Sequence, residues 1–240
     1  MMKTERYASG GETMKMLELF SGSKIMAETF QSHDWEVFTI DGNESLAPDL
    51  SCDILKLDVD RIIELFGRPD VIWASPPCTT FSVASIPHHW ERVEKDNYVP
   101  KTDACRTNIK LIEHTIKLIT ELEPTYWFIE NPRGMIKHIP AIQELKPYRH
   151  LVTYCQYGEK RMKPTHIWSN APIKFKDPCN YGDPCHPTTP RGSKIGTQGQ
   201  KNNFERSKLP IELCEFITQF CLTQFEAGPK EKKAKLEDWL

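Results

Sequence analysis

Short apolar strand patterns alternate with helical patterns through the first half of the sequence, and this alternation constrains the fold most strongly. We expect strands over residues 16–20, 35–40, 71–74 and 126–129, with a short one ending near residue 53. We expect helices over residues 24–31, 58–66 and 103–122, with Asp103 capping the last. Strands separated by helices predict an α/β fold with a mostly parallel sheet and helices on both faces.

Composition narrows the class of protein. The chain has 240 residues, enough for one large domain with a modest insertion. Its net charge of −2 excludes a global cationic field, so any nucleic acid must be bound by a local basic surface. Eight irregularly spaced cysteines, with no signal peptide and no long apolar run, predict a soluble protein of a reducing compartment without a membrane segment.

Local composition divides the chain into five parts. Residues 1–13 are polar and predict a flexible N-terminus, while residues 226–240 are charge-rich and predict a solvated tail or a short helix. Residues 170–205 are rich in proline, glycine and basic clusters with little periodicity, which predicts an irregular insertion. The main body is then residues 14–169, and the chain returns to it over residues 206–225.

The segment Ser75-Pro76-Pro77-Cys78 ends the strand over residues 71–74. Its two prolines remove two backbone donors and fix φ in the loop that leaves the strand. Ligands of α/β folds bind at the carboxyl ends of the strands, so a thiol on this rigid loop is typical of a presented nucleophile. The alternative is a buried structural cysteine.

The segment Glu130-Asn131-Pro132 repeats this design, because a polar pair and a proline again follow a strand. A buried glutamate with a raised pKa, placed beside a thiol, could act as a general acid toward a ring nitrogen. The alternative is a helix cap followed by a proline.

Three strand ends in series carry acids, which predicts a nucleoside pocket. Phe20-Ser21-Gly22 follows the strand of Glu18 and opens a helix, where small residues let a ligand approach the backbone. Asp41 ends the next strand, where dinucleotide-type folds place a carboxylate on a ribose hydroxyl. Asp53 follows at the next edge and could accept a hydrogen bond from an adenine amino group. An ordinary turn with solvated acids is the alternative.

Taken in order, these motifs resemble the conserved blocks of cytosine-C5 DNA methyltransferases, in particular small members of phage and bacterial type. The blocks are Leu17-Glu18-Leu19-Phe20-Ser21-Gly22, Asp41, Asp53-Ile54, Ser75-Pro76-Pro77-Cys78, Glu130-Asn131-Pro132 and Gln156-Tyr157-Gly158. The resemblance covers about residues 14–170 and resumes over residues 206–217. It implies a Rossmann-like S-adenosylmethionine-dependent methyltransferase in which residues 170–205 form a short target-recognition insertion.

The resemblance also implies an activity, which is methyl transfer from S-adenosylmethionine to C5 of a cytosine flipped out of double-stranded DNA. Cys78 would attack C6, Glu130 would protonate or hydrogen-bond N3, and Asn131 would belong to the same catalytic block. The residues implied to bind the cofactor are Glu18, Phe20, Ser21, Gly22, Asp41, Asp53, Ile54 and Pro76. A monomer in the cytoplasm of a bacterial or phage-infected cell, with a role such as restriction-modification, completes the expectation.

The sequence departs from the family pattern at several positions. Thr79 stands where the family usually has Gln, Ser23 stands where a second Gly is common, and the usual Gly-Asn-Ser motif near the C-terminus is missing. The block after Gln156 usually holds two arginines, one of which touches the base. Arg161 or Lys163 could take that part here, and the sequence leaves both open.

Two further segments could contact DNA. Residues 79–102 are polar and poorly periodic, and could be a mobile lid or a plain surface loop. Their candidate contacts are His88, His89, Trp90, Arg92 and Lys95. In and after the insertion, basic residues suit phosphate contacts with some base reading, although a solvated loop would look the same. These are Arg191, Lys194, Lys201, Arg206 and Lys208.

Cys179, Cys185 and His186 in the insertion suggest a zinc site. Their spacing lacks a CxxC pair and a clear fourth ligand, so the sequence favours ordinary loop residues and no metal.

Two other functions remain open at this point. A tRNA cytosine methyltransferase would use the same blocks. A catalytically silent DNA- or cofactor-binding protein would have no need of the thiol, so the presence of Cys78, Glu130 and Asn131 together argues against it.

Overall fold

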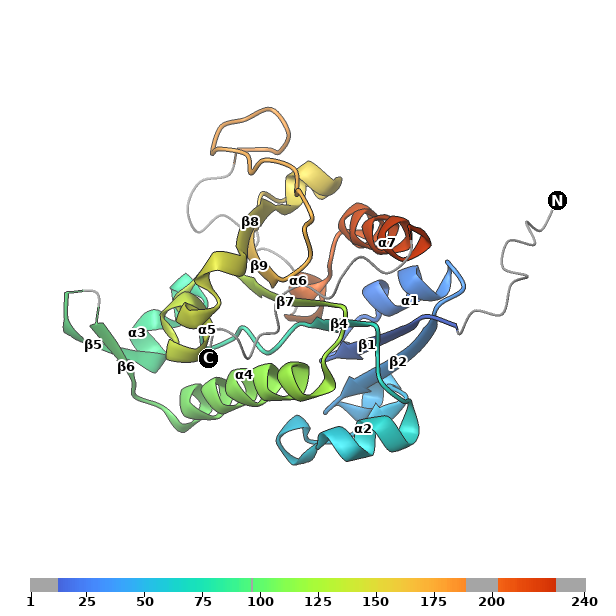
Figure 1. The fold of residues 1–240 in the computed structure, drawn as a ribbon. Coiled ribbons are helices and arrows are strands. Elements are labelled where there is room, and N and C mark those ends of the chain that lie inside the picture. The colour runs from blue at the N-terminus through green and yellow to red at the C-terminus, as the bar shows by residue number, and fades with distance from the viewer. Residues whose placement is uncertain (1–12, 96, 189–202, 228–240) are drawn as a thin grey trace.

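A 7-stranded sheet forms the centre of the computed structural model, which describes residues 13–95, 97–188 and 203–227 (Figure 1). Its strand order is β3-β2-β1-β4-β7-β9-β8. The strands are β1 (Lys15–Leu19), β2 (Glu36–Asp41), β3 (Leu50–Ser51), β4 (Val71–Ala74), β7 (Tyr126–Pro132), β8 (Arg149–Thr153) and β9 (Pro164–Ser169). Neighbours from β3 to β7 pair in parallel, whereas β9 is antiparallel to both β7 and β8. The predicted mostly parallel sheet is confirmed.

Helices cover both faces of this sheet, as predicted. One face packs against α1 (Ile25–Gln31) and α7 (Ile211–Glu226), and the other against α2 (Val59–Leu65), α4 (Asp103–Leu122) and α5 (Pro140–Glu144). Side chains of a strand alternate between the two faces, so Met16 and Leu17 of β1 lie in different cores. The remaining helical segments are η1 (Glu44–Leu46), η2 (Ile54–Lys56), η3 (Val83–Ser85), α3 (Ile86–His89), η4 (Met135–His138), η5 (Lys146–Tyr148), η6 (Tyr154–Tyr157) and α6 (Asn203–Ser207).

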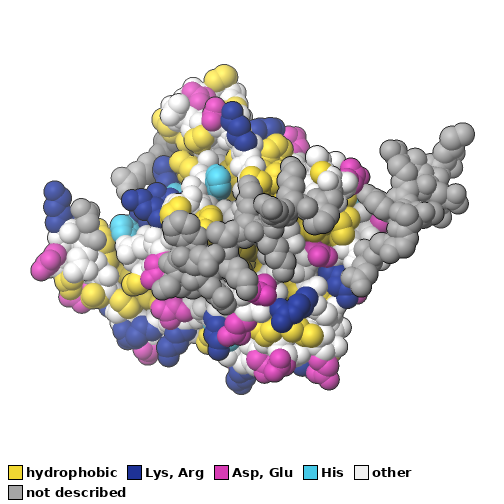
Figure 2. Space-filling view, in the orientation of Figure 1, with side chains coloured by type: hydrophobic (Ala, Val, Ile, Leu, Met, Phe, Trp, Pro, Cys, Tyr) yellow, Lys and Arg dark blue, Asp and Glu magenta, His cyan; other side chains and the backbone are white. Residues whose placement is uncertain are grey.

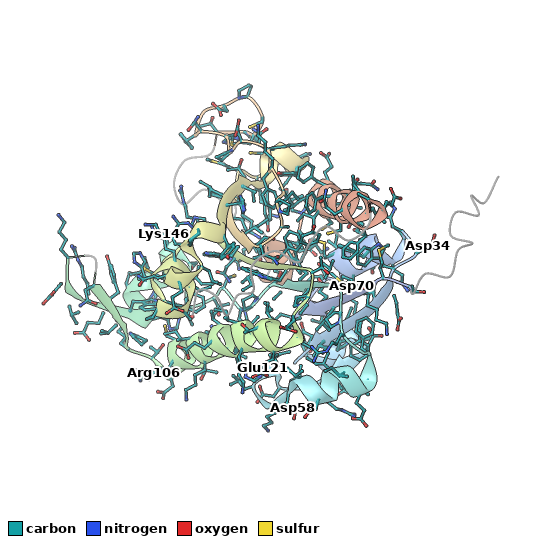
Figure 3. The ribbon with its side chains drawn as sticks, in the orientation of Figure 1. Asp34, Asp58, Asp70, Arg106, Glu121 and Lys146 are labelled. Carbon is teal, nitrogen blue, oxygen red and sulfur yellow. The ribbon has the colours of Figure 1, made fainter. Side chains whose placement is uncertain are left out.

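The predicted strand over residues 71–74 and the helix over residues 103–122 have the predicted bounds, but the cap of the helix is different. Thr102 is the N-cap of α4, and its side-chain oxygen accepts a hydrogen bond from the backbone of Cys105. Asp103 is instead the first helical residue and pairs with Arg106, because a hydroxyl one residue earlier already satisfies the helix end. Figure 3 shows Arg106 and Glu121 at opposite ends of this helix.

Residues 79–102 have more regular structure than the sequence predicts. They contain η3, α3 and an antiparallel hairpin of β5 (Trp90–Glu94) and β6 (Asn97–Pro100). Trp90 is buried at the base of the hairpin, where its ring nitrogen donates to the carbonyl of Thr80 over 2.8 Å. Arg106 donates to the carbonyl of Pro100 and so ties the hairpin to α4. The polar composition concealed these strands because two-stranded hairpins expose most of their side chains.

Several expectations fall partly or wholly on residues that the structure does not describe. Residues 1–12, 96, 189–202 and 228–240 lie outside the described residues, and so do nearly all of the segment predicted to be a flexible N-terminus, most of the predicted charged tail and much of the predicted insertion. The described part of the insertion, residues 170–188, contains neither helix nor strand, as its composition predicts. Within the described ranges, no helix has the length and apolarity that crossing a bilayer requires.

Candidate active site

The candidate site lies at the edge of the sheet where the parallel strands end. Cys78 lies in the loop that follows β4, and Glu130 and Asn131 lie near the end of the neighbouring strand β7. The Phe20–Gly22 turn follows β1, and Asp41 ends β2. The catalytic and cofactor candidates therefore lie along one edge, as the topology of a parallel sheet requires.

The loop of Cys78 is held by backbone and side-chain hydrogen bonds. The Cys78 carbonyl accepts from the amides of Phe81 and Ser82 over 3.0 and 3.2 Å. Buried Asn131 donates from Nδ2 to the carbonyl of Pro76 over 2.9 Å, which joins the ends of β4 and β7. Asn131 therefore positions the proline turn, and the thiol that follows it, relative to Glu130.

A glycine that the sequence analysis did not single out makes a second connection between the two loops. Gly134 forms a bridge with Ser82, and the amide of Met135 donates to the Phe81 carbonyl over 2.7 Å. A Cβ on Gly134 would collide with that carbonyl oxygen. The loops that follow β4 and β7 can approach this closely only because residue 134 has no side chain.

Glu130 is buried, and its Oε1 accepts a hydrogen bond from the hydroxyl of Tyr154 over 2.9 Å. Burial raises the pKa of Glu130, while the charge of Lys163 and the Tyr154 hydroxyl oppose this shift. The carboxyl is therefore disposed to keep a proton that it can donate. Sequence reasoning missed Tyr154, although it stands two residues before the Gln156-Tyr157-Gly158 block.

The two cations that the sequence left open as base contacts have different surroundings in the structure. Lys163 is buried, and its Nζ donates to the carbonyl of Arg206 over 2.9 Å and lies 4.4 Å from the centre of the Tyr154 ring. Its charge acts on both Cys78 and Glu130. Arg161 is also buried but forms an ion pair with Glu159 at 2.9 Å. Lys163 is thus the cation beside the thiol and the carboxyl.

Burial raises the pKa of the Cys78 thiol, and the neighbouring Glu130 raises it further. Lys163 and Arg206 oppose the shift, because a positive charge favours the thiolate. Arg206 comes from α6, beyond the insertion, so charges from both sides of the insertion act on the thiol.

The cofactor candidates form a compact group beside this site. The amide of Gly22, which has φ +49°, donates to Asp41 Oδ2 over 3.0 Å, and the amide of Asn43 donates to Oδ1 over 2.8 Å. Asp41 therefore organises both turns that leave β1 and β2. The hydroxyl of Ser21 is buried and has no hydrogen-bond partner among the described residues. A buried hydroxyl without a partner is the position at which a polar ligand would be expected.

Glu18 and Asp53 complete this group. Glu18 is buried, accepts from the Ala27 amide over 3.1 Å, and has a pKa raised to about 8 by burial. Asp53 caps η2 through a bond from the Leu55 amide to Oδ1, and the preceding residue, Cys52, donates its amide to the Asp41 carbonyl. Ile54 is buried next to Asp53 in the sequence, and Pro76 is buried in the loop that follows β4. The residues present fit a ligand that contains a nucleoside.

The residues predicted to contact DNA lie partly outside the described residues. Arg191, Lys194 and Lys201 lie outside the described residues, whereas Lys208 pairs with Glu205 at 2.9 Å. In the hairpin segment, His88 is exposed, and Nδ1 of His89 bonds the hydroxyl of Thr102 over 2.8 Å. Arg92 and Lys95 are exposed on the hairpin, but Trp90 is structural.

A mostly parallel sheet with helices on both faces and polar residues at its carboxyl edge defines the Rossmann-like methyltransferase fold. The chain belongs to the C-5 cytosine-specific DNA methylase family, whose model matches residues 14–146. Among curated proteins it is similar to the "Probable DNA (cytosine-5)-methyltransferase" of Frog virus 3. The two are 30% identical over 161 residues, which are 65% of this chain and 71% of the viral protein.

Solved structures of methyltransferases are similar at lower identity. A prophage-encoded DNA modification methyltransferase from Escherichia coli is 18% identical with a TM-score of 0.48, over 65% of this chain and 46% of that one. The methyltransferase EhMeth of Entamoeba histolytica is 15% identical with a TM-score of 0.47, over 69% of this chain and 56% of that one. The chain thus spans about half the length of these solved structures.

Proposed function

We propose that this protein transfers a methyl group from S-adenosylmethionine to C5 of cytosine in double-stranded DNA. The observation that carries the proposal is the convergence of Cys78, Glu130 and Lys163 at adjoining strand ends in a chain of this family. A soft nucleophile, a carboxyl that retains a proton and a buried cation are the groups that activation of a pyrimidine ring requires.

The cofactor would be held by the turns that leave β1, β2 and β3. Asp41 and Asp53 would accept hydrogen bonds from the nucleoside, and the Ser21 hydroxyl would gain the partner it lacks among the described residues. When bound, S-adenosylmethionine supplies an electrophilic methyl group for C5.

The chain's own residues would prepare the base. The Cys78 thiolate adds to C6 of a cytosine flipped out of the duplex, while Glu130 protonates or hydrogen-bonds N3. The electron pair released toward C5 makes that carbon nucleophilic. After C5 is substituted, loss of its proton restores the C5–C6 double bond and expels Cys78 as a thiolate.

Lys163 and Tyr154 would set the charge balance of this step. The Lys163 ammonium stabilises the thiolate before attack, which offsets the rise that burial imposes on the Cys78 pKa. Tyr154 fixes one oxygen of Glu130 through its hydroxyl, so the carboxyl presents a defined geometry to the base. Lys163, Tyr154 and Asn131 would thus position the two groups that react.

DNA would be drawn to basic residues beside the site. Arg133, Lys137 and Arg149 are exposed, and together with burial their charges lower the pKa of His166 to about 4. In Figure 2, basic and acidic side chains are interspersed along the lower rim over α4 and α2. That rim would not attract a polyanion, so the basic group beside β7 and β9 is the better candidate for phosphate contacts.

The decisive experiment uses duplex DNA that contains 5-fluorocytosine, with S-adenosylmethionine. Fluorine cannot leave C5 as a proton does, so the wild-type chain should remain covalently attached through Cys78. Cys78→Ser should abolish both trapping and methyl incorporation, whereas Cys105→Ser, in α4, should trap normally. Undiminished trapping by Cys78→Ser would overturn the assignment.

The substrate class needs a second measurement. Methyl incorporation into duplex DNA and into tRNA should be compared at equal enzyme concentration, and we expect DNA to be the substrate. Bisulfite sequencing of DNA from expressing cells would then give the target sequence. A DNA substrate and free thiols fit the cytoplasm of a bacterial or phage-infected cell. Preferential methylation of tRNA would support the alternative function.

A further inference from the structure

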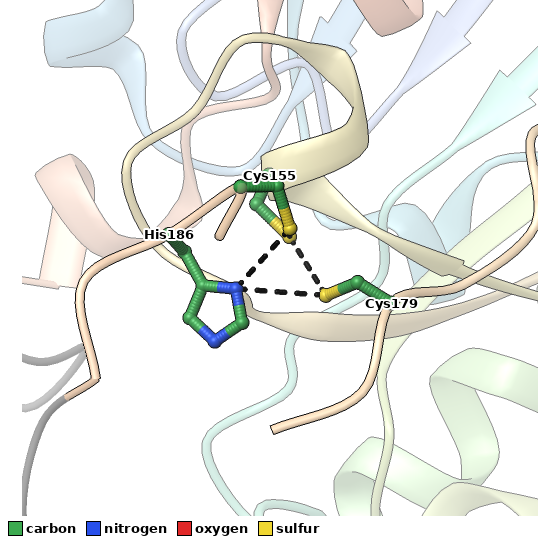
Figure 4. A group of neighbouring side chains, drawn as sticks. Cys155, Cys179 and His186 are labelled. Carbon is green, nitrogen blue, oxygen red and sulfur yellow. Dashed lines mark hydrogen bonds between the residues drawn. The ribbon is translucent and has the colours of Figure 1, made fainter. Parts of the chain in front are cut away.

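Four potential metal ligands meet outside the candidate active site. They are the sulfurs of Cys155, Cys179 and Cys185 and the Nδ1 of His186, and all lie within 4.8 Å of one another. Figure 4 shows Cys155, Cys179 and His186 pointing toward a common centre. Cys155 is the ligand that the sequence does not reveal, because it precedes Cys179 by 24 residues and belongs to η6.

The separations suit a tetrahedral ion. Zinc–sulfur bonds of about 2.3 Å and zinc–nitrogen bonds of about 2.0 Å place tetrahedral ligands about 3.8 Å apart for two sulfurs and about 3.5 Å apart for sulfur and nitrogen. Cys185 lies 3.6 Å from Cys155 and 3.4 Å from His186, and Cys179 lies 3.7 Å from His186. The Cys155 and Cys179 sulfurs are closer, at 3.0 Å, but well beyond the roughly 2.05 Å of a disulfide.

The burial of these side chains argues against a chance meeting of the four potential ligands. Cys155, Cys179 and His186 are each less than a tenth exposed. The Nδ1 of His186 faces the sulfurs of Cys179 and Cys185, whereas its Nε2 is buried without a partner among the described residues. A bound cation would account for burying three polar groups in contact with one another.

The segment that carries the ligands is already shaped without an ion. The Cys179 amide donates to the Thr153 hydroxyl over 2.9 Å, which fixes the segment to the end of β8. A turn lies between Cys179 and Cys185. In it the Asn180 amide donates to Asp183 Oδ2 over 2.6 Å, and the Asp183 amide donates to the Asn180 carbonyl over 3.2 Å. This turn brings Cys185 and His186 back toward Cys179.

We propose that Cys155, Cys179, Cys185 and His186 form a structural zinc site that fixes the described part of the insertion to η6. Four protein ligands would close the coordination sphere, as in structural rather than catalytic zinc sites. Binding replaces the thiol protons of the three cysteines, which are released to solvent, and the zinc keeps its oxidation state. Because Cys155 adjoins Tyr154, the site would also steady the hydroxyl that bonds Glu130.

The proposal is tested by metal content, independently of methyl transfer. The full chain, expressed in zinc-supplemented medium and purified under reducing conditions, should hold about one zinc per chain. Cys185→Ser is the first variant, because Cys185 is the exposed ligand and its loss should leave the fold intact by circular dichroism. Zinc content should fall at least about tenfold in Cys185→Ser and in His186→Ala.

Matched variants identify the ligands. His186→Cys would convert the site to four thiolates and should retain zinc, and Cys52→Ser, outside the cluster, should also retain it. Cobalt(II) added to the metal-free protein should give the visible bands of a tetrahedral site and a thiolate charge-transfer band. Absence of zinc from the wild-type chain, zinc that survives in both Cys185→Ser and His186→Ala, or a Cys155–Cys179 disulfide in metal-free protein would overturn the proposal.

Discussion

Glu18 and Glu130 are two buried carboxyls on strands of the same sheet, yet their surroundings differ. Glu130 accepts a hydrogen bond from the Tyr154 hydroxyl and lies in the field of the Lys163 charge. Both limit the rise that burial causes in the pKa of Glu130. Glu18 accepts from a backbone amide, and burial raises its pKa to about 8. Glu130 therefore lies beside the proposed nucleophile Cys78, while burial favours the neutral form of Glu18 next to the proposed cofactor turn.

The raised pKa of Glu130 predicts how kcat/KM should change with pH. Its acid form persists to higher pH than that of an ordinary glutamate and is lost as pH rises through its pKa. We therefore expect kcat/KM to decrease as pH rises through this pKa. Glu130→Gln should lower kcat by about 10²–10⁴-fold and remove this decrease of kcat/KM at high pH, because an amide cannot deliver a proton. A pH–rate profile checks this, with the exposed Glu144→Gln as control. A loss below about tenfold would favour a purely structural role for Glu130.

At Glu18 the raised pKa predicts an effect of pH on stability. Between pH 4.5 and about 8 the folded state holds a proton that the unfolded state has released. The free energy of unfolding should therefore fall by up to about 1.4 kcal/mol per pH unit through this range. Glu18→Gln should flatten that dependence in urea unfolding, and Glu36→Gln, exposed on β2, should not. Equal slopes in wild type and Glu18→Gln would contradict a buried, protonated Glu18.

At the scale of elements, the site depends on connections between loops. The Asn131–Pro76 bond and the bridge between Ser82 and Gly134 hold the ends of β4 and β7 together. Trp90 extends the connection to the β5–β6 hairpin through its bond to Thr80. The Cys78 loop is thus packed from two sides, and its geometry is a property of several elements.

Gly134→Ala should disturb this arrangement because its Cβ would overlap the Phe81 carbonyl. Overpacking of this kind typically costs about 1–3 kcal/mol, so we expect a lower melting temperature and reduced methyl transfer. Gly42→Ala is the control, since its Cβ would make only an ordinary contact, 3.6 Å from the Cys52 carbonyl. Thermal unfolding and activity of the two variants check the prediction, which is wrong if Gly134→Ala behaves like Gly42→Ala.

The sequence predicts what depends on local patterns. Strand β4 and helix α4 follow from apolar periodicity, and the placement of Cys78 and Glu130 follows from the parallel topology. The Gly134 bridge depends instead on long-range contacts that no local pattern encodes. The cluster of Cys155, Cys179, Cys185 and His186 also depends on long-range contacts, because its members converge only when β8 and the insertion pack together.

At the scale of the whole molecule, a net charge of −2 must be reconciled with a polyanionic substrate. The described basic group of Arg133, Lys137 and Arg149 lies around His166, which pairs with Asn131 where β9 runs beside β7. Attraction to DNA would then be concentrated beside the reactive thiol instead of being spread over the surface.

Removing charge from this group should change the salt dependence of DNA binding. Each phosphate contact contributes a slope of about −0.9 in log affinity against log salt, so Arg133→Ala with Lys137→Ala should flatten the slope by up to about two. Arg61→Ala with Arg68→Ala, on and just beyond α2, should leave it unchanged. Fluorescence anisotropy at several salt concentrations measures this. An unchanged slope in the first pair would place the DNA elsewhere.

The bond from Lys163 to the carbonyl of Arg206 spans 43 residues of chain and closes them into a loop whose neck lies at the thiol. If residues 170–205 form the target-recognition insertion that the family resemblance implies, chemistry and choice of target would occupy separate parts of the chain. The residues of this loop outside β9 and the proposed zinc ligands could then change in length or sequence while its neck stays fixed. New target sequences could then arise from such exchanges without any change in the residues proposed to react.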